Sequence, residues 1–286
     1  GFDHGAPVIS AGRGGAAFEA VQRSWIDRGI VAPWKGTHRV LKSEGFDPLT
    51  APERYVGVPG MSVIVADLLS DIDVRFGARA DRIEQDDGTW RVNDDNGDRL
   101  GTFDALIVAL PAVQAQQLLA GVADDLAAVA AGSVSEPRWS CMIRTNGPTG
   151  ANADSVRIDN GGPLSFIANE TSKPGRSADG DEHWVIHGSA AWSAEHLELD
   201  KPEAADLLAG VWRRTLEHLG ATRTDIAQVS GHRWRYALTS RPHGQPIATD
   251  PAAALVVCGD WLLGDAIGDA IRSGDEAAQA VTPMLR

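Results

Sequence analysis

A short run near the C-terminus constrains the fold more than any other part of the chain. Residues 255–258 read Leu-Val-Val-Cys, an unbroken apolar stretch typical of a buried strand. Gly259 and Asp260 follow at once, and glycines at 264 and 268 lead toward a helix predicted around residues 273–278. This order of strand, corner, loop and helix is typical of an α/β architecture.

The same corner has the chemistry of a flavin site. A glycine at the end of a strand allows the backbone to approach a ligand closely. The carboxylate of Asp260 can accept hydrogen bonds from ribityl hydroxyls. The N-terminus of the helix beyond it favours the negative charge of a reduced flavin. The alternative interpretation of Asp260 is an ordinary turn residue after a strand.

Three further segments agree with this C-terminal signature. The full set comprises Phe2-Asp3-His4-Gly5-Ala6, Tyr55-Val56-Gly57-Val58-Pro59-Gly60-Met61-Ser62, Arg233-Trp234-Arg235-Tyr236-Ala237, and Gly259-Asp260 with Ser273-Gly274 and Ala277-Ala278. In this order they resemble the amine-oxidase superfamily of FAD enzymes, and within it the bacterial renalase-like oxidoreductases. The resemblance runs essentially end to end, and its specificity lies in the ordered set rather than in one motif.

One element of such enzymes is not found in the sequence. They open with a strand, a G-x-G-x-x-G turn and a helix that holds the FAD pyrophosphate. The run Gly12-Arg13-Gly14-Gly15 is rich in glycine, but no apolar strand precedes it. The chain therefore resembles a family member without its first βαβ unit. Without the flanking parallel strands, we expect exposed apolar edges at residues 103–110 and 255–259.

The resemblance also implies an architecture. The expected fold is α/β, of the two-domain glutathione-reductase and amine-oxidase type. A discontinuous FAD-binding domain is expected over residues 1–12, 52–113 and 246–286. A mostly antiparallel substrate domain is expected over residues 13–51 and 114–245.

Hydrophobic patterns predict the individual elements. Helices are expected at residues 18–27, after Ser62 as N-cap, and at 114–119, 123–131 and 201–219. A β-meander is expected over 74–76, 78–84 and 90–92, with turns at 86–88 and 94–97, before a fully buried strand at 103–110. Further strands are expected at 139–145, 164–169, 183–189 and 228–235, and an exposed loop at 171–181.

The resemblance implies a set of residues around the cofactor. They are Gly5, Ala6, Ala80, Leu110, Pro111, Gly259, Asp260, Ala266, Ile267 and Gly268. An ordinary turn explains Gly5-Ala6 equally well, and core packing explains Ala80. Family members often carry Arg-Val-Glu-Gly-Ala where residues 266–270 read Ala-Ile-Gly-Asp-Ala. The acidic side chain is displaced by one place, so backbone contacts at Ala266 and Ile267 are expected to persist better than side-chain contacts.

A second set is expected to face the substrate. It comprises His187, Trp234, Arg235, Tyr236, Asn169 and Trp192, with Lys173 and Arg176 beside them. Aromatic rings can stack on a planar substrate, and Arg235 can neutralise a phosphate or carboxylate. Ordinary packing is the alternative for each tryptophan and for His187. His183 and His187 lie on a predicted strand, about 13 Å apart, so no shared metal site is predicted.

Composition restricts the partners. A net charge of −13 argues against nucleic acid and against an anionic membrane surface. No apolar run reaches the length of a membrane span. Cys141 and Cys258 lie far apart in strand-like apolar surroundings, which indicates buried thiols in a reducing, cytoplasmic setting. The expected partner is a small molecule.

Two functions of different class remain open at this point. The resemblance implies an FAD-dependent oxidase that takes a hydride from a small substrate, such as a dihydronicotinamide isomer or an amine, and passes electrons to O2. The alternative is a truncated or cofactor-free family member that acts as a non-catalytic binding or interaction protein.

Overall fold

The computed structural model describes residues 1–10, 14–50, 53–176 and 179–285 in two compact units. Unit 1 comprises Gly1–Gly12, Gln22–Ser70 and Glu136–Ala237. Unit 2 comprises Arg13–Val21, Asp71–Ser135 and Leu238–Arg286. These units are defined by contacts within the chain and not by function. The boundaries of the flavin and substrate domains therefore stay predictions. The predicted boundaries at 12/13 and 51/52 fall outside the described residues.

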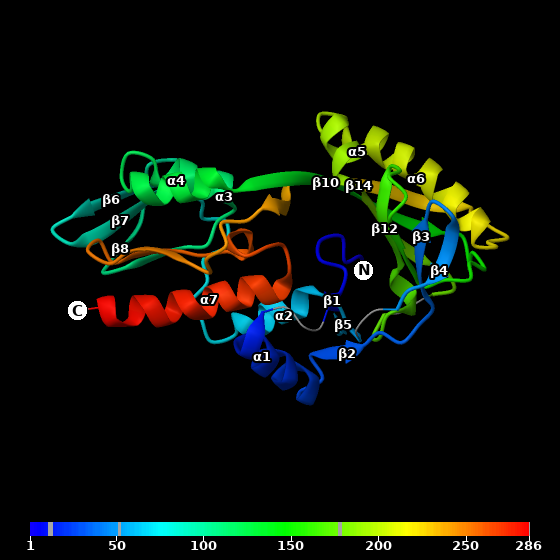
Figure 1. The fold of residues 1–286 in the computed structure, drawn as a ribbon, viewed down its shortest axis with the longest axis horizontal. Coiled ribbons are helices and arrows are strands. Elements are labelled where there is room, and N and C mark those ends of the chain that lie inside the picture. The colour runs from blue at the N-terminus through cyan, green and yellow to red at the C-terminus, as the bar shows by residue number, and fades with distance from the viewer. Residues whose placement is uncertain (11–13, 51–52, 177–178, 286) are drawn as a thin grey trace. The chain divides into compact units, whose positions relative to one another are not determined.

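Unit 1 is built on a seven-stranded sheet (Figure 1). In spatial order its strands are β14 (Ile226–Arg241), β10 (Val134–Thr145), β13 (His183–Gly188), β12 (Leu164–Asn169), β11 (Ser155–Ile158), β3 (His38–Lys42) and β4 (Gly45–Pro48). The strands predicted at 139–145, 164–169, 183–189 and 228–235 are confirmed. The sheet is mixed, because β11 pairs in parallel with β3.

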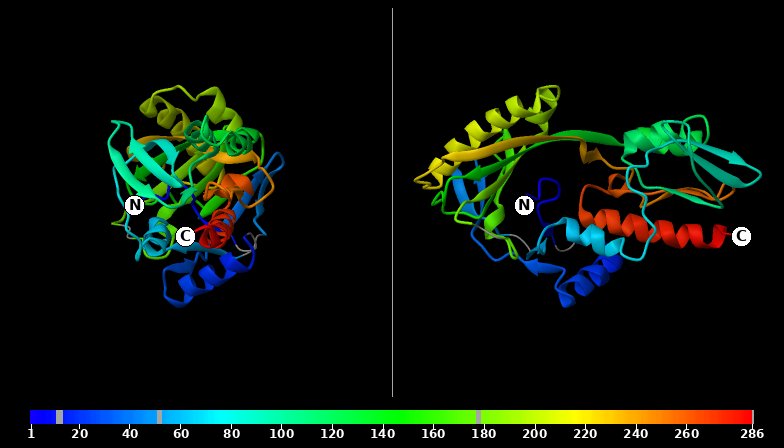
Figure 2. Two further views of the ribbon diagram at one scale, coloured as in Figure 1. Left: turned by 90° about the vertical axis from the view of Figure 1, so that its left-hand side faces the viewer. Right: turned by 180° about the vertical axis from the view of Figure 1, so that it is seen from behind.

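Helix α6 (Lys201–His218) covers one face of this sheet, as Figures 1 and 2 show. Trp212, Leu208 and Leu216 are fully buried against the sheet, as the helical pattern predicts. The apolar Leu207 is 46% exposed, because it lies beside the apolar stripe rather than in it. The helix is followed by Gly220 at φ 79°, the left-handed residue expected at a helix end.

A smaller sheet, β1 (Ile9–Ser10), β5 (Arg54–Gly57) and β2 (Val31–Pro33), also lies in unit 1. Helix α1 (Gly15–Asp27) precedes β2, and α2 (Ser62–Leu68) follows β5. The prediction of Ser62 as N-cap is wrong, since Ser62 is the first helical residue and Met61 stands before it. The Met61 N–H donates to Asp3 Oδ1 at 2.9 Å, so a carboxylate from the N-terminal segment binds the backbone just before the helix.

Unit 2 contains the predicted meander. Strands β6 (Ala80–Asp86), β7 (Thr89–Asp94) and β8 (Arg99–Phe103) pair antiparallel, with turns where the sequence placed them. The short strand expected at 74–76 is wrong. Phe76 in this segment is 88% exposed, so its apolar side chain does not pack in a core as the alternating pattern had indicated.

The buried strand expected at 103–110 is also wrong. Phe103 ends β8, and β9 is confined to Leu106–Val108 in a separate sheet ordered β15 (Ala248–Asp250), β16 (Leu255–Val257), β9. Among the described residues β9 pairs with β16 alone, and its Ile107 is 43% exposed. The expected exposed edge is therefore confirmed for β9, but not for β16, which lies between two strands and is fully buried.

Helices complete unit 2. Helices α3 (Ala112–Leu119) and α4 (Asp124–Gly132) form where helices were predicted, and they lie together beside the sheets (Figure 1). Helix α7 (Ile267–Val281) begins well before the predicted start, so Gly268 lies in its first turn rather than in a loop. No helix in the described part of the chain is both long and apolar enough to cross a membrane. Cys141 and Cys258 are free and buried, as expected.

Candidate functional site

The corner after β16 is tied to helix α7 by one hydroxyl. The Gly259 N–H donates to Ser273 Oγ at 2.8 Å, and Ser273 Oγ donates to the Pro246 carbonyl at 2.6 Å. Ser273 is fully buried, so both bonds are shielded from water. Gly259 has φ 151°, and a Cβ there would lie 2.6 Å from Trp261 Nε1. Only glycine fits this turn without displacing Trp261.

Asp260 presents an acceptor at this corner. Its Oδ1 accepts the Trp261 N–H at 2.8 Å, and no basic side chain of the described residues pairs with it. Burial raises the pKa of Asp260, and the nearby acids Asp265 and Asp269 raise it further. A partly buried carboxylate without a cation is suited to accept hydrogen bonds from neutral hydroxyl groups.

The displaced acidic residue, Asp269, binds the backbone at the start of α7. Asp269 Oδ2 accepts the Ala266 N–H at 3.1 Å, so this predicted cofactor contact is already used inside the protein. The N–H groups of Ile267 and Gly268 have no carbonyl partner within the helix, because they lie in its first turn. Gly14 packs against this turn, since a Cβ on it would lie 2.6 Å from Gly268 Cα.

The remaining predicted cofactor residues of unit 2 have structural contacts. Ala80 and Leu110 pack against the hydrophobic core of this unit, which agrees with the packing alternative for Ala80. The Leu110 carbonyl accepts the Trp261 indole N–H at 3.0 Å. Pro111 stands before α3 as its N-cap residue.

In unit 1 the N-terminal segment is held by a buried ionic cluster of Asp3, Glu170, Lys173 and Arg176. Lys173 lies 2.5 Å from Glu170 and 3.1 Å from Asp3, and it donates to the Pro7 carbonyl at 2.9 Å. Burial raises the pKa of Glu170 to about 7, against the pull of Lys173. Lys173 is buried and not in the exposed loop expected there, because it neutralises these carboxylates.

The cluster fixes the backbone on both sides of Gly5 and Ala6, which are themselves exposed. A Cβ on Gly5 would lie 3.7 Å from the Trp234 ring. The two predicted contacts therefore lie on an anchored segment with accessible backbone.

His4 brings two predicted substrate residues together. The Trp234 indole N–H donates to the His4 carbonyl at 3.1 Å, and the two rings stack with centroids 5.4 Å apart. The His4 backbone also acts on His187, since it favours the protonated form of that ring. Ser140, which pairs with His187 across β10 and β13, also donates to the His4 carbonyl, at 2.8 Å. His232 packs on both His4 and Trp234 at 4.8 and 4.4 Å.

Two imidazole nitrogens of this group are buried without a hydrogen-bond partner. They are His187 Nε2 and His4 Nδ1. Burial and, after it, the positive charge of Arg138 lower the pKa of His187 to about 3, so the ring is neutral near pH 7. A neutral imidazole with one free nitrogen can donate to or accept from a polar group of a ligand.

The other predicted substrate residues do not join this group. Arg235 lies on the opposite face of β14 from Trp234 and binds Glu198 at 2.8 and 3.0 Å. Asn169 Oδ1 accepts the Thr171 N–H and caps a short 3-10 helix. Trp192 stacks on His196 at 4.3 Å. Tyr236 follows on the face of Trp234 and is 40% exposed.

Three residues of the group were not predicted as site residues from the sequence: His4, Ser140 and His232. His232 carried a usable signal, because residues two apart on a strand share a face and Trp234 was already chosen. Ser140 had none, since its pairing with His187 depends on the register of two strands distant in sequence. In the described part of the chain no three His, Cys, Asp or Glu residues are placed to hold a metal ion.

The comparison with protein families decides the assignment. The model of flavin containing amine oxidoreductases matches residues 35–282, which is most of the chain. The chain belongs to the flavin containing amine oxidoreductase family. The family resemblance seen in the sequence is therefore confirmed at this level.

Solved structures of amine oxidases share the fold. Cyclohexylamine oxidase from Brevibacterium oxydans IH-35A superposes with a TM-score of 0.60 at 14% identity, over 82% of this chain and 55% of its own. Putrescine oxidase bound to putrescine gives a TM-score of 0.59 at 13% identity, over 82% of this chain and 55% of its own. The chain thus has the mixed α/β fold of this flavin family and spans about half the length of these enzymes.

Proposed function

We propose that this member of the flavin family is an FAD-dependent oxidoreductase. It takes a hydride from a small substrate, such as a dihydronicotinamide isomer or an amine, and passes the electrons to O2. The four sequence segments support a place near the renalase-like enzymes. The two free thiols support a cytoplasmic location.

The observation that carries the proposal is the corner at Gly259 and Asp260. Its carboxylate has no basic partner among the described residues, its backbone is locked by Ser273, and a helix begins a few residues later. These are the groups that a ribityl chain and a flavin ring need: a hydroxyl acceptor, close backbone, and first-turn N–H donors. FAD supplies the redox chemistry when bound, and the protein supplies position and electrostatics.

Within unit 1 we assign the substrate pocket to the group around His4. Trp234 offers an aromatic face for a planar substrate. His187, held neutral by burial, offers a hydrogen bond without adding charge next to a substrate that loses a hydride. Arg235, Asn169 and Trp192 lie outside this assignment because their side chains are engaged elsewhere.

The test is substrate-driven reduction of the FAD-loaded protein. Under anaerobic conditions, a dihydronicotinamide isomer or an amine should bleach the visible flavin absorption, and admitted O2 should restore it with release of hydrogen peroxide. Trp234→Leu should lower kcat/KM about tenfold through lost stacking, whereas the exposed Arg223→Gln should leave it unchanged. An FAD-loaded protein that no amine or reduced nicotinamide bleaches would refute the proposed activity.

A further inference from the structure

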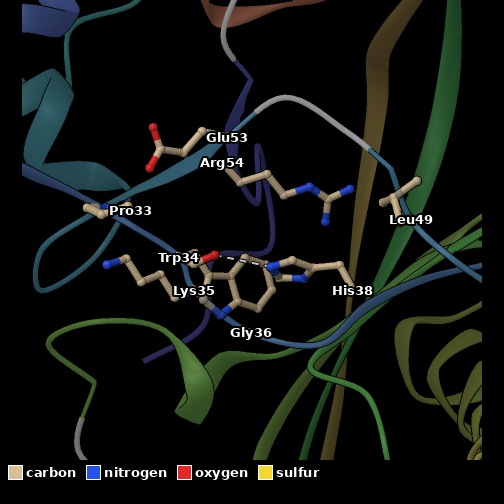
Figure 3. Close-up of a pocket in the computed structure, with 8 residues that line it drawn as sticks. All are labelled: Pro33, Trp34, Lys35, Gly36, His38, Leu49, Glu53 and Arg54. Atoms are coloured by element: carbon tan, nitrogen blue, oxygen red, sulfur yellow. Dashed lines mark hydrogen bonds between the residues drawn. The ribbon is translucent and has the colours of Figure 1, made fainter.

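A pocket of about 320 Å³ lies in unit 1, apart from every residue assigned to flavin or substrate (Figure 3). It is lined by Pro33, Trp34, Lys35, Gly36, His38, Leu49, Glu53 and Arg54. Figure 3 shows Arg54 reaching across it toward His38 and Leu49, while Glu53 and Lys35 lie at the other end.

Arg54 is half-buried and has almost none of its hydrogen-bonding capacity satisfied. Its Nη1 donates to Ser155 Oγ at 2.9 Å, and this is its one side-chain bond to the described residues. A guanidinium carries five N–H donors, so most of the fork is free. Burial lowers the pKa of Arg54, and repulsion from Arg157 lowers it further, yet the group remains charged near neutral pH.

The carboxylates beside the pocket are committed to other partners. Glu53 accepts the Tyr55 phenol at 2.6 Å, and Asp154 accepts the Thr37 N–H at 2.7 Å. Neither pairs with Arg54. A half-buried arginine without a carboxylate needs water or an anion to complete its shell, so it is available to an anionic ligand.

The walls hold Arg54 in one orientation. The Trp34 carbonyl can only accept, so the bond of 3.1 Å to His38 Nε2 places a proton on that nitrogen. Burial lowers the pKa of His38, and the neutral ring then accepts from Ser155 Oγ at Nδ1, 2.8 Å away. Ser155 in turn accepts from Arg54. Each link of the chain Arg54–Ser155–His38–Trp34 thus has one donor and one acceptor, and the chain orients the guanidinium through Nη1 while leaving its other N–H groups free for a ligand.

We propose that this pocket binds a small organic or inorganic oxyanion, a carboxylate or a phosphate, through the free edge of Arg54. The planar fork matches both anions in a bidentate geometry. Leu49 gives the occupant an apolar wall. The charges of Lys35 and Glu53 at the far end offset each other, so the positive charge for an anion comes from Arg54. This site does not depend on flavin binding or on oxidase activity.

The test is a calorimetric titration of the purified protein with benzoate and, separately, with inorganic phosphate. We expect saturable binding of at least one, and the two arms identify which anion is preferred. Arg54→Gln should weaken binding about tenfold or more, because it removes the charge and the fork. Lys42→Gln, which removes an exposed cation from β3 outside the pocket, should change it less than about twofold.

Arg54→Lys is the control for loss of binding through misfolding. It keeps the charge but lacks the fork, so it should bind the anion with intermediate affinity and retain the native circular dichroism. Absence of saturable binding to the wild-type protein would overturn the proposal. Equal binding by wild type and Arg54→Gln, or equal weakening by Lys42→Gln, would overturn it as well.

Discussion

His187 couples stability to pH. Its pKa is about 3 in the folded protein, against about 6.5 when unfolded, so below pH 6.5 the unfolded chain binds the extra proton. The stabilisation is therefore complete above pH 6.5 and is lost as the pH falls toward 3. Between pH 7.5 and 5.5 the loss from this one group should be about 1.4 kcal/mol.

His38, His183 and His232 also have lowered pKa values and act in the same direction, so the comparison needs a variant. His187→Gln should lose about 1.4 kcal/mol less of its own unfolding free energy over this range than wild type does. Urea unfolding at the two pH values measures the free energy of unfolding of both proteins. Equal pH sensitivity of the two proteins would show that His187 is protonated in the fold.

Gly14 should tolerate no side chain. A Cβ would lie 2.6 Å from the Gly268 backbone, and φ is 108°, a region that other residues rarely adopt. Gly14→Ala should lower the free energy of unfolding by about 3 kcal/mol. Gly15→Ala is the matched control, because φ is 66° and nothing lies within 4 Å, so its cost should be about 1 kcal/mol. Similar costs for the two variants, measured by chemical denaturation, would contradict the close contact between Gly14 and α7.

At the scale of elements, Ser273 joins helix α7 to the end of β16. Ser273→Ala leaves the Gly259 N–H and the Pro246 carbonyl without their partner in a buried place, which should cost about 2 kcal/mol. Thr282→Ala is the control, because its hydroxyl bonds back to the Ala278 carbonyl in an exposed position and should cost less than about 0.5 kcal/mol. Thermal unfolding of the two variants compares them directly. A Ser273 variant as stable as wild type would mean that the corner is not locked as described.

An element was predictable from the sequence where its hydrophobic pattern matches the residues that it buries. Helix α6 carries its apolar stripe and its terminal glycine in one segment, and β12 and β13 are short apolar strands in the core. The strand expected at 103–110 failed because local hydrophobicity cannot reveal which sheet a residue joins. Ser62 failed as a cap because it is already the first helical residue, and the carboxylate that binds the backbone before it, Asp3, lies far away in the sequence.

The candidate site also has parts that the sequence could predict and parts that it could not. The corner at Gly259 and Asp260 was predictable, since its residues are adjacent and their chemistry is local. The group around His4 was only half predictable, because four segments distant in sequence build it. The engagement of Arg235 by Glu198 and of Ala266 by Asp269 required coordinates, as neither sequence pattern indicates a partner.

At the scale of the whole molecule, the two units have separate cores, and the predicted flavin contacts are distributed over both. Gly5 and Ala6 belong to unit 1, while Gly259, Asp260 and the first turn of α7 belong to unit 2. A ligand that binds only the folded chain stabilises it by mass action. FAD should therefore raise the Tm of this protein in proportion to the logarithm of its concentration, which differential scanning fluorimetry with a non-flavin readout measures.

The central claim is that this chain holds FAD at the corner after β16. The direct measurement is the visible spectrum of the purified protein after incubation with FAD and gel filtration. We predict flavin bands that elute with the protein, and an affinity at least about tenfold lower in Asp260→Ala, which removes the hydroxyl acceptor. Asp275→Asn, an exposed change on helix α7, should retain the bands. A colourless protein that leaves all FAD in the small-molecule fraction would contradict the claim.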